Sequence, residues 1–431
     1  MSALAALGLG LAASIIAIII AGVVGWAWRR GKPLARPVTP DQLREALDGQ
    51  RRELLQDIQN VFNHYYGIAA KPAEQLVITS DEERLRLLAL ATKAQREGRY
   101  ADAVDMLRSS FRPGLPPQEL LALHNLIGNT YMYMGRPRQA EPHYGEVLAV
   151  AKQMGDEQAR ATALGNLGTV YGVYGDLGRA EEHFEQALAI HRDTADRLGQ
   201  ADALGNLGNT YLLRGELDKA EEHHRKALAI HEEIDNRLGQ AQDLDNLGVV
   251  CRRRGELDKA EEHHKKAHAI FEEIGNRLGQ ARNLGNLGLV YADRGDLHKA
   301  EEYHRKALAI HEEIGNRLGQ AIQLGNLGNV YARRGEVDEA EEHYKRALAT
   351  HQEIGNRLGQ ADALANLGLV AEQGGGADKA RALLERAKAL YEAIGAGGQG
   401  PEVVREALER LGTGGPPKPK RARKKLPPKA P

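Results

Sequence analysis

The chain has 431 residues, and its 58 basic and 59 acidic side chains give a net charge of -1, which excludes a globally basic or acidic partner surface. The single cysteine, Cys251, cannot form an intrachain disulfide, and no Cys/His cluster has zinc-finger spacing. Aromatic residues make up only 5%, whereas glycine occurs 48 times, which indicates closely packed helices rather than a β-sandwich. Four basic residues in 1–40 and seven in 412–431 leave residues 41–411 with a net charge of about -12, so the chain has basic ends and an acidic body.

The first 28 residues contain no charged side chain, and residues 12–24 (AASIIAIIIAGVV) are nearly all aliphatic. With its flanks this run can span a hydrocarbon core of about 30 Å. Trp26, Trp28 and then Arg29 and Arg30 follow it, as in an interfacial belt with a positive cytoplasmic flank. We therefore expect a transmembrane helix over 1–28 and a single-pass membrane protein with its repeat domain on the cytoplasmic side. A cleaved secretory signal is the alternative, although no basic residue precedes the apolar run.

Residues 29–80 form a basic flank and a juxtamembrane segment. Within it, Leu47, Leu54, Ile58, Val61 and Tyr65 follow one helical stripe. A linker helix folding back on the first repeat and a short coiled coil are both consistent with this stripe. Small residues at four-residue spacing in the apolar span would also allow close helix approach. A homodimer through the membrane and juxtamembrane helices is therefore possible.

A 40-residue period dominates the rest of the chain. The string GNRLGQA occurs at 275–281, 315–321 and 355–361, with DNRLGQA at 235–241 and DRLGQA at 196–201. Such a period is typical of a solenoid. Within one period the apolar residues have helical spacing on both sides of a turn at 214–216, so each unit is expected to be a helix hairpin. Gly208 and Ala220 are small where the two helices would cross.

One unit carries the pattern Leu204, Leu207, Gly208, Tyr211, Ala220, His224 and Ala227. It resembles the W-L-G-Y-A-F-A signature of the tetratricopeptide repeat family and recurs seven times from about residue 119 to 395, with an eighth, shorter unit at 82–112. The family's tryptophan is leucine here and its late proline is missing, as in the forty-residue variant of kinesin light chains and spindle-orienting scaffolds. The resemblance implies an all-α fold, a right-handed superhelical solenoid of about eight hairpins over 82–395. Residues 400–411 would supply the terminal capping helix.

Comparison of the repeats with one another predicts a binding face. The second, ninth, twelfth and thirteenth positions of the first helix vary most and share one face, which also carries an unvarying asparagine. In the resembled family this face lines a concave groove for peptide segments, and an amide that donates and accepts could hold a peptide backbone of any sequence. Alternatively, the asparagines only cap or bridge neighbouring helices. The candidate groove residues are Asn166, Asn206, Asn209, Asn246, Asn286, Asn326, Asn329, Asn366, Arg253, Arg282 and Arg333.

The sequence contains no motif of an enzyme. It lacks a Walker-type lysine, a nucleophile elbow and an HExxH string, so neither catalysis nor a cofactor is expected. Histidines such as His231 and His311 recur in register, but equivalent positions of stacked helices are about 10 Å apart, too far to share one metal ion. His224 stands where Phe184 and Tyr344 stand in other units, and Cys251 stands where Tyr211 stands, so both are expected to fill the core.

The tail from residue 412 is rich in proline and glycine and wholly basic, so we expect it to be disordered. Anionic lipid, nucleic acid and a merely solubilising end are its three interpretations. The residues that would contact an anionic surface are Lys418, Lys420, Arg421, Arg423, Lys424 and Lys425. The sequence as a whole predicts a membrane-anchored scaffold that binds partner peptide segments in the groove, with a lipid- or nucleic-acid-associated adaptor acting through the tail as the alternative.

Overall fold

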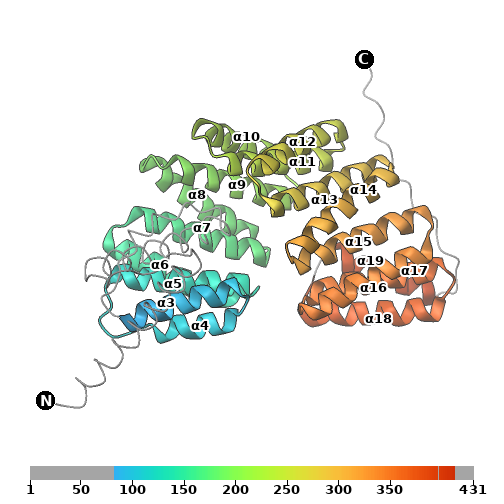
Figure 1. Cartoon of the computed structure of the whole chain (residues 1–431), viewed down its shortest axis with the longest axis horizontal. Coiled ribbons are helices and arrows are strands. Elements are labelled where there is room, and N and C mark those ends of the chain that lie inside the picture. Colours follow the sequence, from blue (N-terminus) through green and yellow to red (C-terminus); the bar gives the residue numbers. More distant parts are fainter. Residues whose placement is uncertain (1–81, 397, 413–431) are drawn as a thin grey trace, which may run out of the picture. The chain divides into compact units, whose positions relative to one another are not determined.

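The computed structural model describes residues 82–396 and 398–412, which form helices α3 to α19 and no strand (Figure 1). The expectation of an all-α fold is confirmed for this part of the chain. The predicted transmembrane helix, the juxtamembrane segment and the basic tail lie outside it. Among the helices of residues 82–412 that the structure describes, none combines the length and the apolar character that a bilayer crossing requires.

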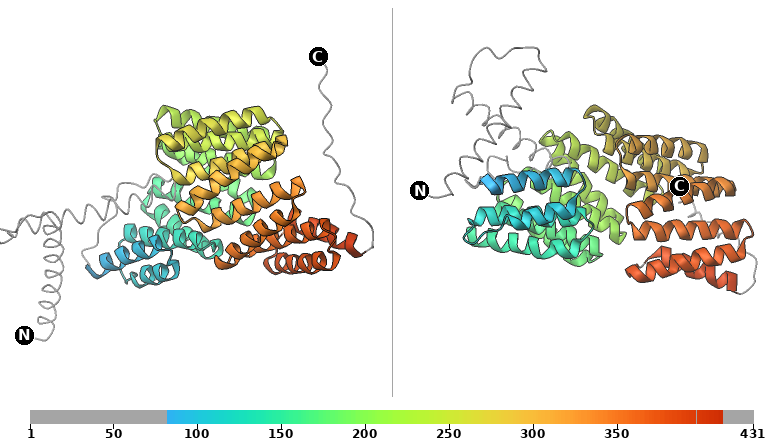
Figure 2. Two further views of the ribbon diagram at one scale, coloured as in Figure 1. Left: turned by 45° about the vertical axis from the view of Figure 1, so that its right-hand side comes forward. Right: turned by 60° about the horizontal axis from the view of Figure 1, so that its bottom comes forward.

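The helices form eight successive pairs followed by one terminal helix (Figures 1 and 2). Each first helix packs against its own second helix, and each second helix packs against the first helix of the next pair. This repeated packing is that of a helix-hairpin solenoid. The first helices are α3 (Glu82–Arg96), α5 (Pro117–Tyr133), α7 (Glu157–Tyr174), α9 (Arg197–Arg214), α11 (Arg237–Arg254), α13 (Arg277–Arg294), α15 (Arg317–Arg334) and α17 (Arg357–Gln373). The second helices are α4 (Tyr100–Ser109), α6 (Pro137–Met154), α8 (Leu177–Asp193), α10 (Leu217–Glu233), α12 (Leu257–Glu273), α14 (Leu297–Glu313), α16 (Val337–Glu353) and α18 (Ala377–Ile394).

The last helix, α19 (Gln399–Gly412), contains the segment expected to cap the array. It packs against α18 and α17. Its buried residues, Val404 and Ala407, join the apolar cluster of Leu384 and Tyr391, whereas its other side chains are half-buried or exposed. One face of α19 therefore covers the apolar edge of the last hairpin, and the other faces solvent.

The repeated connector between hairpins has a structural explanation. The side chain of Asn236 accepts a hydrogen bond from the backbone N–H of Gly239 and so caps α11. Gln240 donates to the carbonyl of His231, the residue at the end of the preceding helix. A Cβ at Gly239 would lie 2.5 Å from the ring of His231, so only glycine lets the two helices approach this closely. Arg237 binds both Gln240 and Glu273 of the next second helix. The connector thus ties three consecutive helices together.

The crossing point inside each hairpin is equally tight. A Cβ at Gly208 would lie 2.7 Å from the imidazole of His224, and Ala220 is completely buried. His224 is also completely buried, and so is His264 in the next hairpin. Cys251 is 3% exposed. The predictions that small residues mark the crossing and that these histidines and the cysteine fill the core are confirmed.

Candidate functional site

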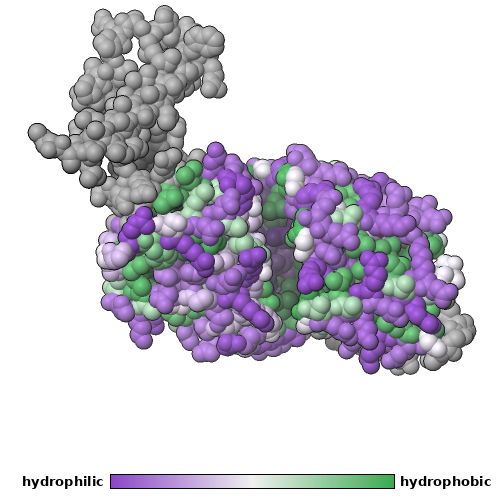
Figure 3. Space-filling view, turned by 90° about the horizontal axis from the view of Figure 1, so that it is seen from below, coloured by the Kyte–Doolittle hydropathy of each residue, from purple (hydrophilic) through white to green (hydrophobic). Residues whose placement is uncertain are grey.

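The predicted asparagine row lies on the first helices of six successive hairpins, and each of its members is half-buried. Their neighbours at the variable positions are open to solvent: Val173 and Leu213 are each 61% exposed and Ile322 is 48% exposed. Figure 3 views the array from below, where mainly hydrophilic side chains surround a hollow. The members of the row are Asn166, Asn206, Asn246, Asn286, Asn326 and Asn366.

Two members of the row bridge neighbouring helices. Asn166 donates from Nδ2 to Oδ1 of Asn125 at 3.0 Å, and Asn286 donates to Oδ1 of Asp245 at 3.1 Å. Each acceptor lies 41 residues earlier, on the preceding first helix. At these two positions the asparagine bridges neighbouring helices, which was the alternative to peptide binding.

The other four members have no such acceptor. The residue 41 positions earlier is glycine in each case: Gly165, Gly205, Gly285 and Gly325. No hydrogen bond of the described residues uses the side-chain amides of Asn206, Asn246, Asn326 and Asn366. A half-buried amide without a protein partner is available to a ligand, since it offers both donors and an acceptor. The row is therefore divided into two bridging amides and four free ones.

The remaining predicted groove residues also differ in their partners. Asn209 and Arg333 are exposed and form no hydrogen bond or ion pair within the described residues. Arg253 donates to the backbone carbonyl of Leu212 at 2.7 Å. Arg282 forms an ion pair, with its Nε 3.3 Å from Asp245 Oδ2. Asn329 accepts a hydrogen bond at Oδ1 from the hydroxyl of Tyr344 at 2.7 Å.

A buried polar cluster behind the middle of this face was not predicted. The carboxylate of Asp245, 2% exposed, accepts from Asn283 Nδ2 at 2.8 Å and lies 2.9 Å from Nδ1 of His264. Burial alone would raise the pKa of Asp245, but the hydrogen bond and charge of His264 outweigh it, with help from Arg282, and lower the pKa. This carboxylate is therefore ionised and fully surrounded by donors. Because Asn286 is one of these donors, the cluster fixes one groove amide in place.

A second buried acid, Asp243, lies in the same helix. Its Oδ2 is 2.8 Å from Nδ1 of His231, and its Oδ1 is 3.4 Å from Nδ1 of His224. Nε2 of His231 is 3.8 Å from Asp202. Burial acts to lower the pKa of His231, yet Asp202 and Asp243 together raise it to about 9. His231 is thus a cation at neutral pH inside the array.

Differences between the repeats indicate these clusters in the sequence. Where the second helix carries a histidine in the core slot, the residue 19 positions later is polar, and where it carries an aromatic ring, that residue is alanine. We call the first kind central junctions: His224 with Asp243, His264 with Asn283, and His304 with Gln323. We call the second kind flanking junctions: Tyr144 with Ala163, Phe184 with Ala203, and Tyr344 with Ala363.

Other predicted sites receive no structural description. The six basic tail residues from Lys418 to Lys425 lie outside the described residues, as does the membrane segment. Within residues 82–396 and 398–412, no three histidine, cysteine, aspartate or glutamate side chains are grouped as metal ligands.

The geometry defines the class of protein as an α-helical repeat solenoid with a polar face on its first helices. The family model for the tetratricopeptide repeat matches residues 119–193, 173–233, 199–273, 239–313 and 319–393, more than half of the chain. The chain belongs to the tetratricopeptide repeat family. Arrays of this family are protein–protein interaction scaffolds, generally without enzymatic activity. The comparison with curated proteins found no match.

Solved structures share the fold at low sequence identity. A Rap protein in complex with competence and sporulation factor is 16% identical with a TM-score of 0.50, over 77% of this chain and 98% of that one. A signal-transduction ATPase with numerous domains from Pyrococcus horikoshii, which has a tetratricopeptide repeat sensor, is 15% identical with a TM-score of 0.50, over 88% of this chain and 66% of that one. A putative kinesin light chain of Podosopora anserina with nearly identical repeats is 21% identical with a TM-score of 0.38, over 46% of this chain and 100% of that one.

Proposed function

We propose that the array is a scaffold that binds partner peptide segments along the first-helix face. The observation that carries the proposal is the set of four free amides, Asn206, Asn246, Asn326 and Asn366, each preceded by a glycine 41 residues earlier. Every peptide bond has one N–H and one C=O, which a side-chain amide can bind together regardless of the residue type. The free amides would therefore hold the main chain of the ligand.

Selectivity would come from the variable positions beside the amides. Val173 and Leu213 offer exposed apolar contacts near the N-terminal part of the row, whereas Arg333 offers an exposed cation near Asn326 and Asn366. The fixed amides and these changing neighbours together support a groove that reads both main chain and side chains. A partner segment matching them would place apolar side chains against Val173, Leu213 and Ile322 and an acidic one against Arg333.

The test compares two sets of substitutions in the full chain reconstituted in nanodiscs. Peptides are first selected from a random display library on the parent protein. The quadruple variant N206A, N246A, N326A and N366A should lose these peptides while its helical circular dichroism is unchanged. The matched control, N166A with N286A, removes the two bridging amides and should keep peptide binding, with some loss of stability.

A second arm tests whether the main chain is what the amides bind. Selected peptides in which single backbone N–H groups are methylated should bind about tenfold more weakly, because one hydrogen bond with its acceptor is lost. Alanine substitution of most single peptide side chains should have a smaller effect. Peptides that bind the quadruple variant as tightly as the parent would contradict the proposal.

We further propose, from the apolar run and its basic flank, that residues 1–28 anchor the array at the cytoplasmic side of a membrane. A cysteine introduced before this run should react with a membrane-impermeant thiol reagent in sealed cells, whereas one introduced after it should react only when the cells have been opened. The adaptor function of the basic tail is the second candidate. Binding of nucleic acid or anionic vesicles should then weaken steeply with salt and disappear when residues 418–425 are neutralised, whereas peptide binding to the array should respond mildly.

A further inference from the structure

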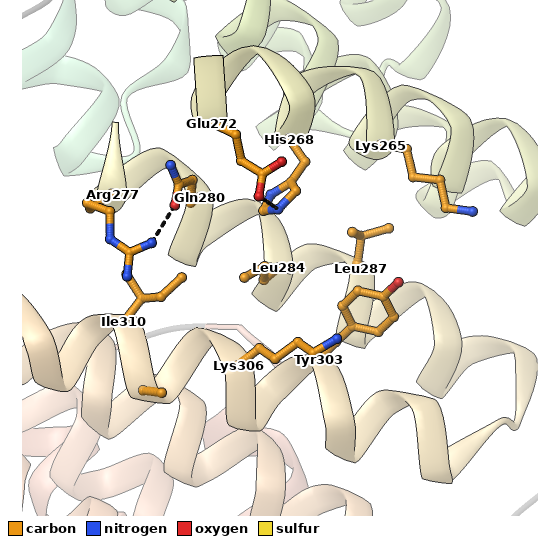
Figure 4. Close-up of a pocket in the computed structure, with 11 residues that line it drawn as sticks. Lys265, His268, Glu272, Arg277, Gln280, Leu284, Leu287, Tyr303, Lys306 and Ile310 are labelled. Atoms are coloured by element: carbon orange, nitrogen blue, oxygen red, sulfur yellow. Dashed lines mark hydrogen bonds and ion pairs between the residues drawn. The ribbon is translucent and has the colours of Figure 1, made fainter. Parts of the chain in front are cut away.

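A pocket of about 500 Å³ lies between two second helices, α12 and α14, which both pack against α13. Leu284 and Leu287 of α13 line it between these helices, and Ile310 and Tyr303 of α14 form an apolar wall (Figure 4). Its volume falls in the range of small-molecule sites, and its lining combines apolar side chains with polar and charged ones. The pocket involves none of the four free asparagines.

The pocket lies where the chain departs from its own repeat. His268 occupies a position that is leucine in five other hairpins: Leu148, Leu188, Leu228, Leu308 and Leu348. Tyr303 likewise stands where five other hairpins have histidine: His143, His183, His223, His263 and His343. Repeated packing needs neither exchange, since neighbouring hairpins stack without them. Both exchanges contribute side chains to the same pocket.

The two exchanged side chains are held in place. The ring of Tyr303 stacks on Tyr291 with 5.2 Å between ring centroids. His268 Nε2 lies 3.5 Å from Glu272, and its Nδ1 is buried without a hydrogen-bond partner. Burial lowers the pKa of His268, and Glu272 does not offset it, so the ring is neutral at pH 7 and contributes a flat wall. The pocket therefore has fixed walls before any ligand enters.

The charges at the edge of the pocket are mainly positive. Lys265, Lys306 and Arg277 line it, against one acid, Glu272. Each lysine pairs with a glutamate four residues earlier on its own helix; the pair of Lys306 with Glu302 is exposed, and both ammonium groups themselves face solvent, so these contacts contribute little free energy at the lysine end. Both ammonium groups can therefore turn to a ligand anion at small cost.

From this arrangement we propose that the pocket binds a small organic carboxylate with an apolar body. The apolar part would lie on Leu284, Leu287 and Ile310, against the ring of Tyr303. The carboxylate would lie at the edge near Lys265 and Lys306. This binding site is independent of the asparagine row and of the peptide-binding function proposed for it.

The probe pair that tests the proposal is para-trifluoromethyl-hydrocinnamate and its uncharged amide, observed by fluorine NMR against the full chain in nanodiscs. The acid should bind at least about tenfold more tightly than the amide, because only the acid makes a charge-assisted contact. Lys306→Gln, an exposed substitution that leaves the helix intact, should weaken the acid and leave the amide unchanged. Equal binding of acid and amide to the parent would overturn the proposal.

The site is located by a second pair of variants. His268→Leu restores the leucine that five other hairpins have at this position and should abolish acid binding. His223→Leu makes the same chemical change outside the pocket and should leave acid binding as in the parent. Acid binding that survives His268→Leu, with helicity of both variants verified by circular dichroism, would place the ligand elsewhere and overturn the assignment.

Discussion

The central junctions of the array bury histidine against polar side chains, whereas the flanking junctions bury aromatic rings beside alanine. Both kinds have the same 19-residue spacing and the same crossing glycine, such as Gly248 against His264 and Gly168 against Phe184. The hairpin geometry therefore does not depend on the polarity of this contact. It depends on the match between the two residues, because a buried histidine needs a polar partner and a buried aromatic ring needs only space.

One central junction also connects the core with the candidate binding face. Asp245 holds His264 on its buried side and Asn286 on the side of the asparagine row. The corresponding residue is glycine in the other two central hairpins, at Gly205 and Gly285, as it is in the flanking hairpin at Gly165. The connection between core and face therefore belongs to Asp245 and not to every central junction. The carboxylate of Asp245 thus binds the amide of Asn286 and fixes its side chain.

The largest expected effect is the loss of a buried acid from a central junction. Asp245→Ala leaves His264 and Asn283 without their carboxylate in the core. Each buried polar group that loses its hydrogen-bond partner costs about 1–3 kcal/mol, so the loss of this acceptor should cost several kcal/mol in total. Urea unfolding of the full chain, followed by circular dichroism, should show a free energy of unfolding lower by this amount. A loss below about 1 kcal/mol would mean that the cluster contributes little beyond an ordinary hydrogen bond.

Two controls sharpen this result. Gly325→Ala places an alanine at the position of α15 that corresponds to Asp245, and its methyl group would meet no atom within 4 Å. It should raise the free energy of unfolding by about 0.5–1 kcal/mol, because alanine has a higher helix propensity than glycine. The triple variant D245G, H264F and N283A converts the junction to the flanking kind. It should recover stability to within about 1 kcal/mol of the parent, because apolar residues of similar volume can replace a buried pair. Failure to recover would show that the two kinds of junction are not interchangeable.

The next effect is a dependence on pH that belongs to the middle of the array. His231 has a pKa of about 9, above the ordinary value of 6.5, because of Asp202 and Asp243. Its contribution to stability is therefore complete below pH 6.5 and is lost as the pH rises through 9. With about 1.4 kcal/mol for each pKa unit, the loss is at most about 3.5 kcal/mol.

Urea unfolding at pH 7 and pH 10 measures this loss as the difference between the parent and His231→Gln. The variant should lose less stability on alkalinisation than the parent. His311→Gln is the control, because burial lowers the pKa of His311 and its neutral form is the stable one at alkaline pH. An equal alkaline loss in the parent and His231→Gln would rule out the buried cation.

The sequence predicts the array well because its period repeats the same packing problem. Helical spacing, the crossing at Gly208 and the core role of His224 follow from residues that face each other within one hairpin. Which asparagines are free was not predicted, because this depends on a residue 41 positions away on another helix. The buried acids were missed for the same reason. In the sequence Asp243 is one of several residues that differ between repeats, and its histidine partners lie on another helix.

The pocket at His268 was also missed, although the exchange of leucine for histidine is visible in the sequence. A single exchange does not show whether neighbouring side chains fill the space that it borders. That depends on the separation of α12 and α14, which only the packing of three helices determines. Internal comparison of repeats therefore locates unusual positions, and the structure decides which of them line one site.

The smallest expected effect concerns a feature that both regions share. The connector arginines Arg197, Arg237, Arg277 and Arg317 pair with Glu233, Glu273, Glu313 and Glu353, each 36 residues later. The last connector arginine, Arg357, has Ala393 at that distance and forms no ion pair within the described residues. Since exposed pairs contribute about 0.2–1 kcal/mol, Arg237→Ala should cost that much and Arg357→Ala less.

The comparison is decisive when the arginines of the two regions are deleted separately and together. Arg197→Ala and Arg277→Ala should each lower the free energy of unfolding by a similar small amount, and the double variant by their sum, because the two pairs share no residue. Both losses should shrink at high salt, since the pairs are exposed. A larger cost at Arg277 would show that the central junctions transmit strain to the connector, and the two regions would then differ in more than their core residues.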